Sequence, residues 1–99
     1  MVIEVRQTDE FRTWLNSLRD EKAVTRIVAR IRRLEQGNPG DSKSVGARLL
    51  ELRIDYGPGY RVYYVKHGVT VVILLCGGDK RAQQRDIKRA QALAAKLKD

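Results

Sequence analysis

Apolar residues recur with a helical period in three parts of the chain. They are spaced three or four apart from Phe11 to Leu18 and from Val24 to Leu34, which predicts two amphipathic helices joined almost directly. Gly37 marks the end of the second helix. The same period returns in a last helix from about Arg81 to Lys98. Residues able to cap the three N-termini are Thr8 and Asp9, Asp20, and Asp79.

Short runs of β-branched and aromatic residues indicate four strands. The predicted strands are Val2 to Val5, Arg48 to Asp55, Tyr60 to Lys66 and Val69 to Cys76. The last run is apolar on both faces, which is typical of a central strand, and we expect Gly77-Gly78 to end it. Residues 38–44 read as a loop, and Gly57-Pro58-Gly59 forms the turn between the second and third strands.

The order strand, helix, helix, strand, strand, strand, helix predicts one α+β domain covering residues 1–99. The three later strands follow one another through short turns, so they should form an antiparallel meander. We expect the two N-terminal helices and the C-terminal helix to lie against one side of this sheet.

The charge of the chain points to a polyanionic or acidic partner. Lys and Arg number 20 against 12 Asp and Glu, which gives a net charge of +8, and the pI is near 10.1. Arginine outnumbers lysine, and its planar guanidinium favours bidentate phosphate contacts. A generally soluble surface is the alternative. The polar face of the second predicted helix carries Lys22, Arg26, Arg30, Arg32 and Arg33.

Nothing in the chain indicates secretion or membrane insertion. The N-terminus has no basic start followed by a long apolar stretch. The longest apolar run, Val69 to Cys76, is far shorter than the ~20 residues of a membrane helix. The single cysteine excludes an internal disulfide. We therefore expect a soluble cytoplasmic protein with no membrane contact.

The second and third predicted strands bring two arginines together. If their turn is centred on Gly57, Arg53 lies directly opposite Arg61, where like charges destabilise a sheet by up to ~1 kcal/mol. A phosphate held between both guanidinium groups would reverse that effect. The alternative is that Glu51 or Asp55 neutralises one arginine. Strand alternation places Glu51 and Tyr63 on the same face as the arginines.

A second basic cluster follows the central strand. Lys80, Arg81 and Arg85 surround the predicted start of the last helix, where free amides and the helix dipole attract phosphate. The glycine pair before them matches no nucleotide-binding fingerprint. An ordinary strand-to-helix connection with solvated charges is the alternative.

Several other chemistries are not supported. One histidine and one cysteine cannot supply a zinc site, and no acidic cluster has two-metal spacing, so we expect no metal and no cofactor. The serines have no nearby base in the sequence. Among the aromatic residues, Tyr56 and Tyr63 are the best candidates to contact a nucleic-acid base.

Two blocks of sequence resemble a known protein group. Leu52 to Tyr63 resembles a block typical of the RelE/ParE toxin superfamily, and more closely of its phage-derived, HigB-like addiction-module killer subfamily. Leu74 to Lys80, followed by Gln83 to Ile87, matches a second block of that subfamily. Further matches are Phe11, Trp14-Leu15, Arg30 to Leu34 and Gly37 to Asp41.

The resemblance implies a RelE-like fold with a curved antiparallel sheet. It also implies a cognate antitoxin, often a helix-turn-helix protein, with DNA contacted only through the antitoxin complex. Related toxins cut messenger RNA on the ribosome without a metal. By this resemblance Arg53, Arg61 and Lys80 would be catalytic. Residues expected to bind RNA are Tyr56, Tyr63, Arg81, Gln83 and Arg85.

The chain departs from the RelE pattern at two places. Leu50-Glu51 stands where a lysine is common, and Asp86-Ile87 stands where a tyrosine or histidine is common. Proton transfer would then fall to Lys80, or to Asp86 with a raised pKa. Ribosome-dependent, metal-independent cleavage of messenger RNA is the leading hypothesis. A ParE-like inhibitor of DNA gyrase and a non-catalytic nucleic-acid-binding module are the alternatives.

Overall fold

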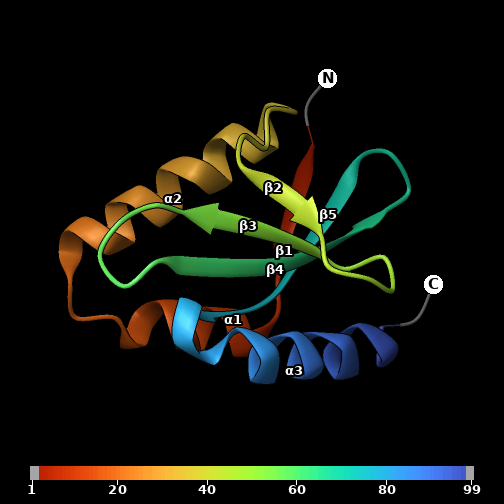
Figure 1. The fold of residues 1–99 in the computed structure, drawn as a ribbon. Helices are drawn as coiled ribbons and strands as arrows, with labels where there is room; N and C mark the ends of the chain where they lie inside the picture. Colours follow the sequence, from red (N-terminus) through yellow and green to blue (C-terminus); the bar gives the residue numbers. More distant parts are fainter. Residues whose placement is uncertain (1–2, 98–99) are drawn as a thin grey trace.

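Five strands form one curved sheet with helices on both of its faces, in a computed structural model that describes residues 3–97 (Figure 1). The elements are β1 (Glu4–Gln7), α1 (Asp9–Ser17), α2 (Glu21–Glu35), β2 (Ser42–Ser44), β3 (Leu50–Ile54), β4 (Tyr60–His67), β5 (Val71–Asp79), a 3-10 turn (Lys80–Ala82) and α3 (Gln83–Ala95). The predicted α+β class is confirmed, and β2 is an added strand in the predicted loop. Val2 and Lys98, at the ends of two predicted elements, lie outside the described residues.

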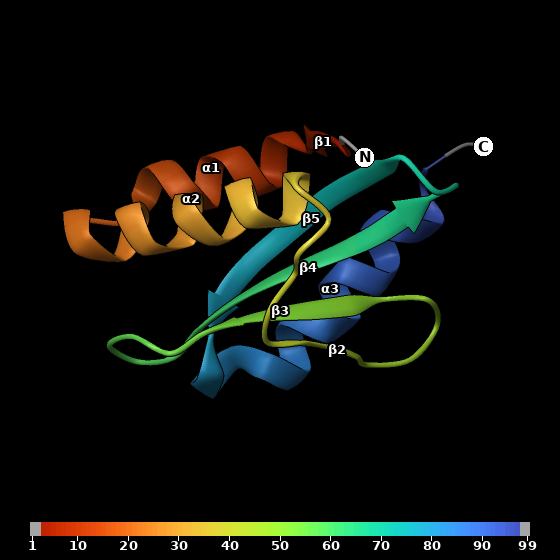
Figure 2. The same ribbon diagram turned by 90° about the horizontal axis from the view of Figure 1, so that it is seen from above.

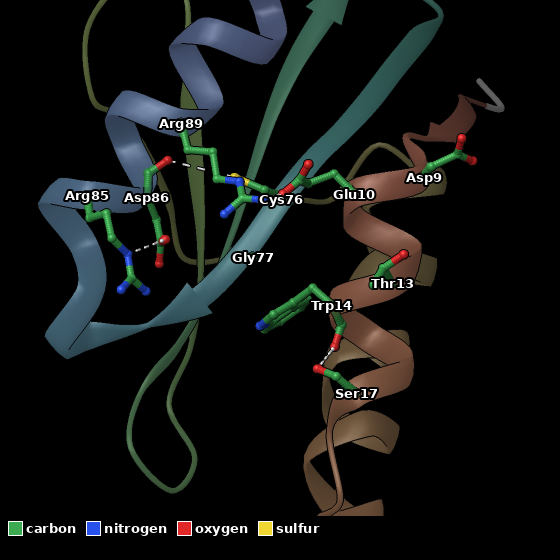
Figure 3. Close-up of a pocket in the computed structure, with 10 residues that line it drawn as sticks. All are labelled: Asp9, Glu10, Thr13, Trp14, Ser17, Cys76, Gly77, Arg85, Asp86 and Arg89. Carbon is green, nitrogen blue, oxygen red and sulfur yellow. Dashed lines mark hydrogen bonds and ion pairs between the residues drawn. The ribbon is translucent and has the colours of Figure 1, made fainter.

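The sheet has the strand order β1-β5-β4-β3-β2. Strands β3, β4 and β5 form the predicted antiparallel meander, and β5 is internal for the first half of its length. β1 pairs with it in parallel, but only from Val71 to Leu74. Beyond Leu74, the outer edge of β5 is therefore not covered by a strand, and α1 and α3 approach it there (Figure 3).

Polar side chains cap α1 and α2 as predicted, whereas α3 itself, with Ala82 at its N-cap, begins without a side-chain cap. Thr8 Oγ1 accepts a hydrogen bond from the Phe11 amide at 3.0 Å. Asp20 accepts from two amides at the start of α2. Asp79 accepts from the Arg81 amide at 2.9 Å, so it caps the 3-10 turn that leads into α3. Each bond satisfies an amide that has no partner within its own helix.

The sheet separates two apolar cores. α1 and α2 cover one face, and α3 covers the other (Figure 2). The prediction that all helices lie on one side is therefore wrong. The physical reason is β5, whose apolar residues point to both faces and need cover on both. The first core holds Phe11, Ile27, Ile31, Leu34, Leu52, Ile54, Val62, Tyr64, Val72 and Leu74, and the second holds Leu49, Tyr63, Val65, Leu75, Cys76 and Ala90.

β5 continues through Gly77 and Gly78, so these glycines do not end the strand as expected. Their role is close packing. A Cβ on Gly77 would overlap the Trp14 ring of α1, and a Cβ on Gly78 would overlap the Asp86 carboxylate of α3. The absence of both side chains lets α1 and α3 approach the same stretch of strand from opposite faces.

No helix within residues 3–97 is both long enough and apolar enough to cross a membrane.

Candidate functional site

Three neighbouring strands bring Arg53, Arg61 and Gly78 into one row at the end of the sheet. Arg53 of β3 pairs with Arg61 of β4, and Arg61 pairs with Gly78 of β5. The predicted register of the two arginines is therefore confirmed. Two guanidinium groups now lie side by side on the face that α3 covers.

The carboxylate of Glu51 lies between these arginines. Its Oε1 atom is 3.2 Å from Arg53 Nε and 3.9 Å from Arg61 Nε. Its Oε2 atom accepts hydrogen bonds from Tyr63 Oη at 3.1 Å and from Gln83 Nε2 at 2.7 Å. Glu51 is fully buried. The alternative raised from the sequence, local neutralisation by Glu51, is therefore present, and the three charged groups together keep one net positive charge.

The two arginines differ in exposure. The Arg53 side chain is 33% exposed, whereas that of Arg61 is 11% exposed. Arg61 Nε is buried and has no hydrogen-bond partner, although it lies near the Glu51 carboxylate. A ligand that approaches this end of the sheet therefore meets Arg53 first. Arg61 contributes mainly positive potential from below the surface.

Exposed cations border this arginine pair at the start of α3. Lys80, Arg81 and Arg85 are all exposed. Lys80 packs beside Gly59 in the β3–β4 turn, and Gln83 reaches down to Glu51. The residues from Lys80 to Gln83 thus connect the surface of the loop with the buried carboxylate. We call the set Glu51, Arg53, Arg61, Lys80, Arg81 and Gln83 the arginine site.

Tyr63 does not belong to any accessible surface. It is fully buried under α3, and burial together with the neighbouring Glu51 carboxylate raises the pKa of its hydroxyl. This position contradicts the expectation that Tyr63 contacts a base. The expectation failed because the strand face that was taken as open is covered by α3.

Tyr56 lies apart from the arginine site, against α2. Its hydroxyl donates to Asp20 Oδ2 at 2.9 Å, which raises the pKa of the tyrosine and lowers that of the aspartate. The guanidinium of Arg26 lies over its ring, 4.8 Å from the centroid. One ring face is therefore already occupied, and Tyr56 joins the β3–β4 turn to α2.

Arg30 is a supporting residue that the sequence did not identify. It donates to the backbone carbonyls of Arg53 and of Pro39, the latter at 2.8 Å, and to that of Asp41 at 3.1 Å. Burial lowers its pKa. The periodicity placed Arg30 among the solvated cations of α2, but its side chain fixes the backbone of β3 behind Arg53.

A cleft of about 500 Å³ separates α1 from α3 beside the uncovered edge of β5 (Figure 3). Trp14 points into it from α1, with its indole nitrogen toward the open space. Asp86 and Cys76 close the opposite side. Burial raises the pKa of the Cys76 thiol to about 12, and its Sγ donates to the Asp86 carbonyl oxygen at 3.7 Å.

Asp86 is a buried carboxylate with an incomplete set of partners. Its Oδ2 atom has no hydrogen bond, while Oδ1 is 3.6 Å from Nε of the exposed Arg85. Burial raises the pKa of Asp86, and Arg85 opposes that shift only in part. The raised pKa expected from the sequence is therefore present. Its cause is removal from solvent beside Gly78.

Replacing Asp86 by asparagine should stabilise the protein at neutral pH. The pKa of Asp86 in the folded protein lies above its ordinary value of 3.8, so the free energy of unfolding falls as pH rises between these two pKa values. Asp86→Asn removes the buried charge, and we expect a gain of about 1 kcal/mol at pH 7. The gain should vanish near pH 4. Urea unfolding at both values measures it.

Asp9→Asn is the matched control, because the Asp9 side chain is 98% exposed on α1. It should leave the free energy of unfolding almost unchanged at both pH values. A loss of stability in Asp86→Asn at pH 7 would instead mean that the charged form is needed at the start of α3.

Within residues 3–97 there is no cluster of three or more His, Cys, Asp or Glu side chains that could hold a metal ion. The arginine site offers cations of the kind that hydrogen-bond to phosphate oxygens. Arg53 is accessible, Lys80 and Arg81 flank it, and Glu51 holds the guanidinium groups in place.

Comparisons with known proteins identify a family and a relative by sequence. Residues 13–98 match the family model described as phage-derived protein Gp49-like. An uncharacterized protein of Haemophilus influenzae is 50% identical over 97 residues, which is 98% of each chain.

Solved structures show the same fold at low sequence identity. A mutant of the E. coli toxin RelE in the free state has a TM-score of 0.72, with 16% identity over 98% of this chain and 100% of that one. The toxin–antitoxin complex RelBE2 of Mycobacterium tuberculosis has a TM-score of 0.66, with 21% identity over 81% of this chain and 100% of the matched chain.

Proposed function

We propose that this chain, which belongs to the family of phage-derived Gp49-like proteins and has the fold of RelE toxins, is the toxin of a toxin–antitoxin pair. We further propose that it cleaves messenger RNA on the ribosome, as a HigB-like member of the superfamily. The observation that carries this proposal is the arginine site. It places one accessible and one buried arginine beside exposed Lys80 and Arg81.

The proposed reaction needs little more than charge and position. The 2′-hydroxyl of a ribose loses its proton to water as its oxygen attacks the adjacent phosphorus, the bond to the 5′-oxygen breaks, and a cyclic phosphate remains. Negative charge grows on the phosphate oxygens during this step. Arg53 would contact those oxygens directly, and Arg61 would add positive potential from below. Exposed Lys80 would supply a proton to the leaving 5′-oxygen.

The site offers no free strong base, which supports a role for the ribosome. Glu51 already accepts from three side chains and lies near a fourth donor, and Tyr63 is buried with a raised pKa. Asp86 is buried as well. Free RNA would therefore react slowly. A ribosome that bends the message and aligns the 2′-hydroxyl could supply about 7–11 kcal/mol of the barrier.

Other parts of the proposal follow from the same role. Arg81, Gln83 and Arg85 would hold the RNA backbone on either side of the cut, and Tyr56 could reach it only from the α2 side. A helix-turn-helix antitoxin would neutralise the protein and carry its only contact with DNA. The toxin would work in the cytoplasm, without a metal or a cofactor.

Expression of this chain alone should stop growth within a few generations, and co-expression of the antitoxin encoded beside it should restore growth. Translation should collapse before replication. Primer extension on RNA from induced cells should show new 5′ ends inside translated regions, and purified protein should cut messages only when ribosomes are added.

The control is the same message without a ribosome-binding site, which should stay intact in induced cells. Intact messages together with trapped gyrase–DNA complexes would show that the protein inhibits gyrase and does not cleave messenger RNA. Normal growth of cells that contain the folded protein would contradict the proposal that it is a toxin.

A further inference from the structure

A second groove lies at the far end of α3 from the arginine site. It has a volume of about 320 Å³, between the C-terminal part of α3 and the ends of β3, β4 and β5. Its lining is formed by Ala47, Arg48, Leu49, Val65, Lys66, His67, Ile73, Gln91, Ala94, Ala95 and Leu97. From Gln83 to Ala94 the helix rises by about 17 Å, so the two sites are well separated.

The groove combines an apolar floor with a basic rim. Leucine, valine, isoleucine and alanine side chains form the floor, and Leu97 is 36% exposed at its end. Arg48 and Lys66, both exposed, stand on the rim. None of the described residues that line it is acidic. A ligand that fits must therefore offer apolar side chains on one face and carboxylates at its edges.

The backbone at the rim is held in an uncommon conformation. Ala47 and Arg48 have φ angles of 51° and 65°, in the left-handed region that non-glycine residues rarely occupy. Two such residues in succession cost free energy, and such strain gathers at ligand-binding positions. Here the strained loop directs Arg48 to the edge of the groove.

We propose that this groove docks an acidic amphipathic segment of the antitoxin. The inference rests on the proposed toxin function and adds the surface that the partner uses. Charge complementarity selects the occupant, because a second copy of this chain, at +8, would bring like charge to the rim. RNA would match the basic rim but not the apolar floor. This groove would anchor the antitoxin away from the arginine site.

Charge reversal on the rim should separate neutralisation from toxicity. The double variant Arg48→Glu/Lys66→Glu should still stop growth, because neither residue belongs to the arginine site. Co-expressed antitoxin should no longer restore growth. With purified antitoxin, the product of the neighbouring reading frame, calorimetry should show an affinity about 100-fold lower than for the parent protein. Ala95→Trp, which places a ring over the floor, should also weaken binding.

Arg32→Glu/Arg33→Glu is the matched control, because it makes the same charge change on exposed residues of α2. It should remain both toxic and neutralised. Unchanged antitoxin affinity in the rim and Ala95 variants would overturn the proposal. Loss of toxicity in the folded rim variant would overturn it too, since the groove would then serve RNA or the ribosome. If the parent chain failed to stop growth, the proposed toxin function would be wrong. The affinity measurement would still test whether the groove binds the antitoxin.

Discussion

Replacing Glu51 by alanine should lower the free energy of unfolding by about 3–5 kcal/mol, which is enough to unfold a large share of a small domain at 37 °C. The physical reason is the position of its carboxylate. It is fully buried and lies between two arginines whose side chains would otherwise repel each other. The loss would also leave the hydroxyl of Tyr63 and the amide of Gln83 without their acceptor.

Thermal and urea unfolding measure this effect, and Asp55→Ala is the control in the same hairpin. Asp55 is exposed, so its removal should change stability by less than about 0.5 kcal/mol. Sulfate should recover part of the loss in Glu51→Ala, because an anion can take the place of the carboxylate between the guanidinium groups. Equal stability of the two variants would show that Glu51 does not hold the site together.

Replacing Arg53 by alanine should reduce ribosome-dependent cleavage by about 10²–10³-fold, the usual effect of removing one donor to a developing oxyanion. Growth on induction should return. The melting temperature should fall only slightly, because the lost contact with Glu51 is partly offset by removing one of two facing arginines, and Arg53 is partly exposed. The facing like charges alone would suggest an equally small change for Arg61→Ala. The structure changes that expectation, because Arg61 is mostly buried against Glu51 and its removal should also cost stability.

Single-turnover cleavage of a programmed ribosome complex gives the rate, and circular dichroism checks the fold. Lys43→Ala, on the exposed surface of neighbouring β2, is the matched control and should cleave normally. Arg53→Lys should keep part of the activity, since it retains the charge but loses the planar fork. Full activity in a folded Arg53→Ala protein would mean that the reaction takes place elsewhere.

Local patterns in the sequence were sufficient for the elements and for one register. Alternation along β3 and β4 and the Gly57-Pro58-Gly59 turn placed Arg53 opposite Arg61, as found. Thr8 and Asp20 cap the helices that they were predicted to cap, whereas Asp79 caps the 3-10 turn before α3 and not α3 itself. These features depend on residues that are close together in the chain, so the local sequence is enough to predict them.

What could not be predicted depends on contacts between distant segments. Tyr63 was expected on an open face because nothing in its own strand shows that α3 packs there. The apolar character of β5 on both faces was the one available signal for cover on both sides. Arg30 looked solvated for a similar reason, since its three carbonyl partners come from the following loop and from β3. Gly77 and Gly78 resembled a strand ending, although they serve the packing of Trp14 and Asp86.

Cys76 gives the molecule a built-in reporter of its own opening. It is the sole cysteine of the chain, it lies beneath α3, and its thiol has a pKa of about 12. A thiol reagent at neutral pH therefore modifies it mainly when a local opening, such as separation of α3 from the sheet, exposes the thiol. The rate of labelling measures how often that happens. A partner bound in the groove at the end of α3 would lower the labelling rate of Cys76. The labelling rate would therefore report binding without a fluorescent label on either protein.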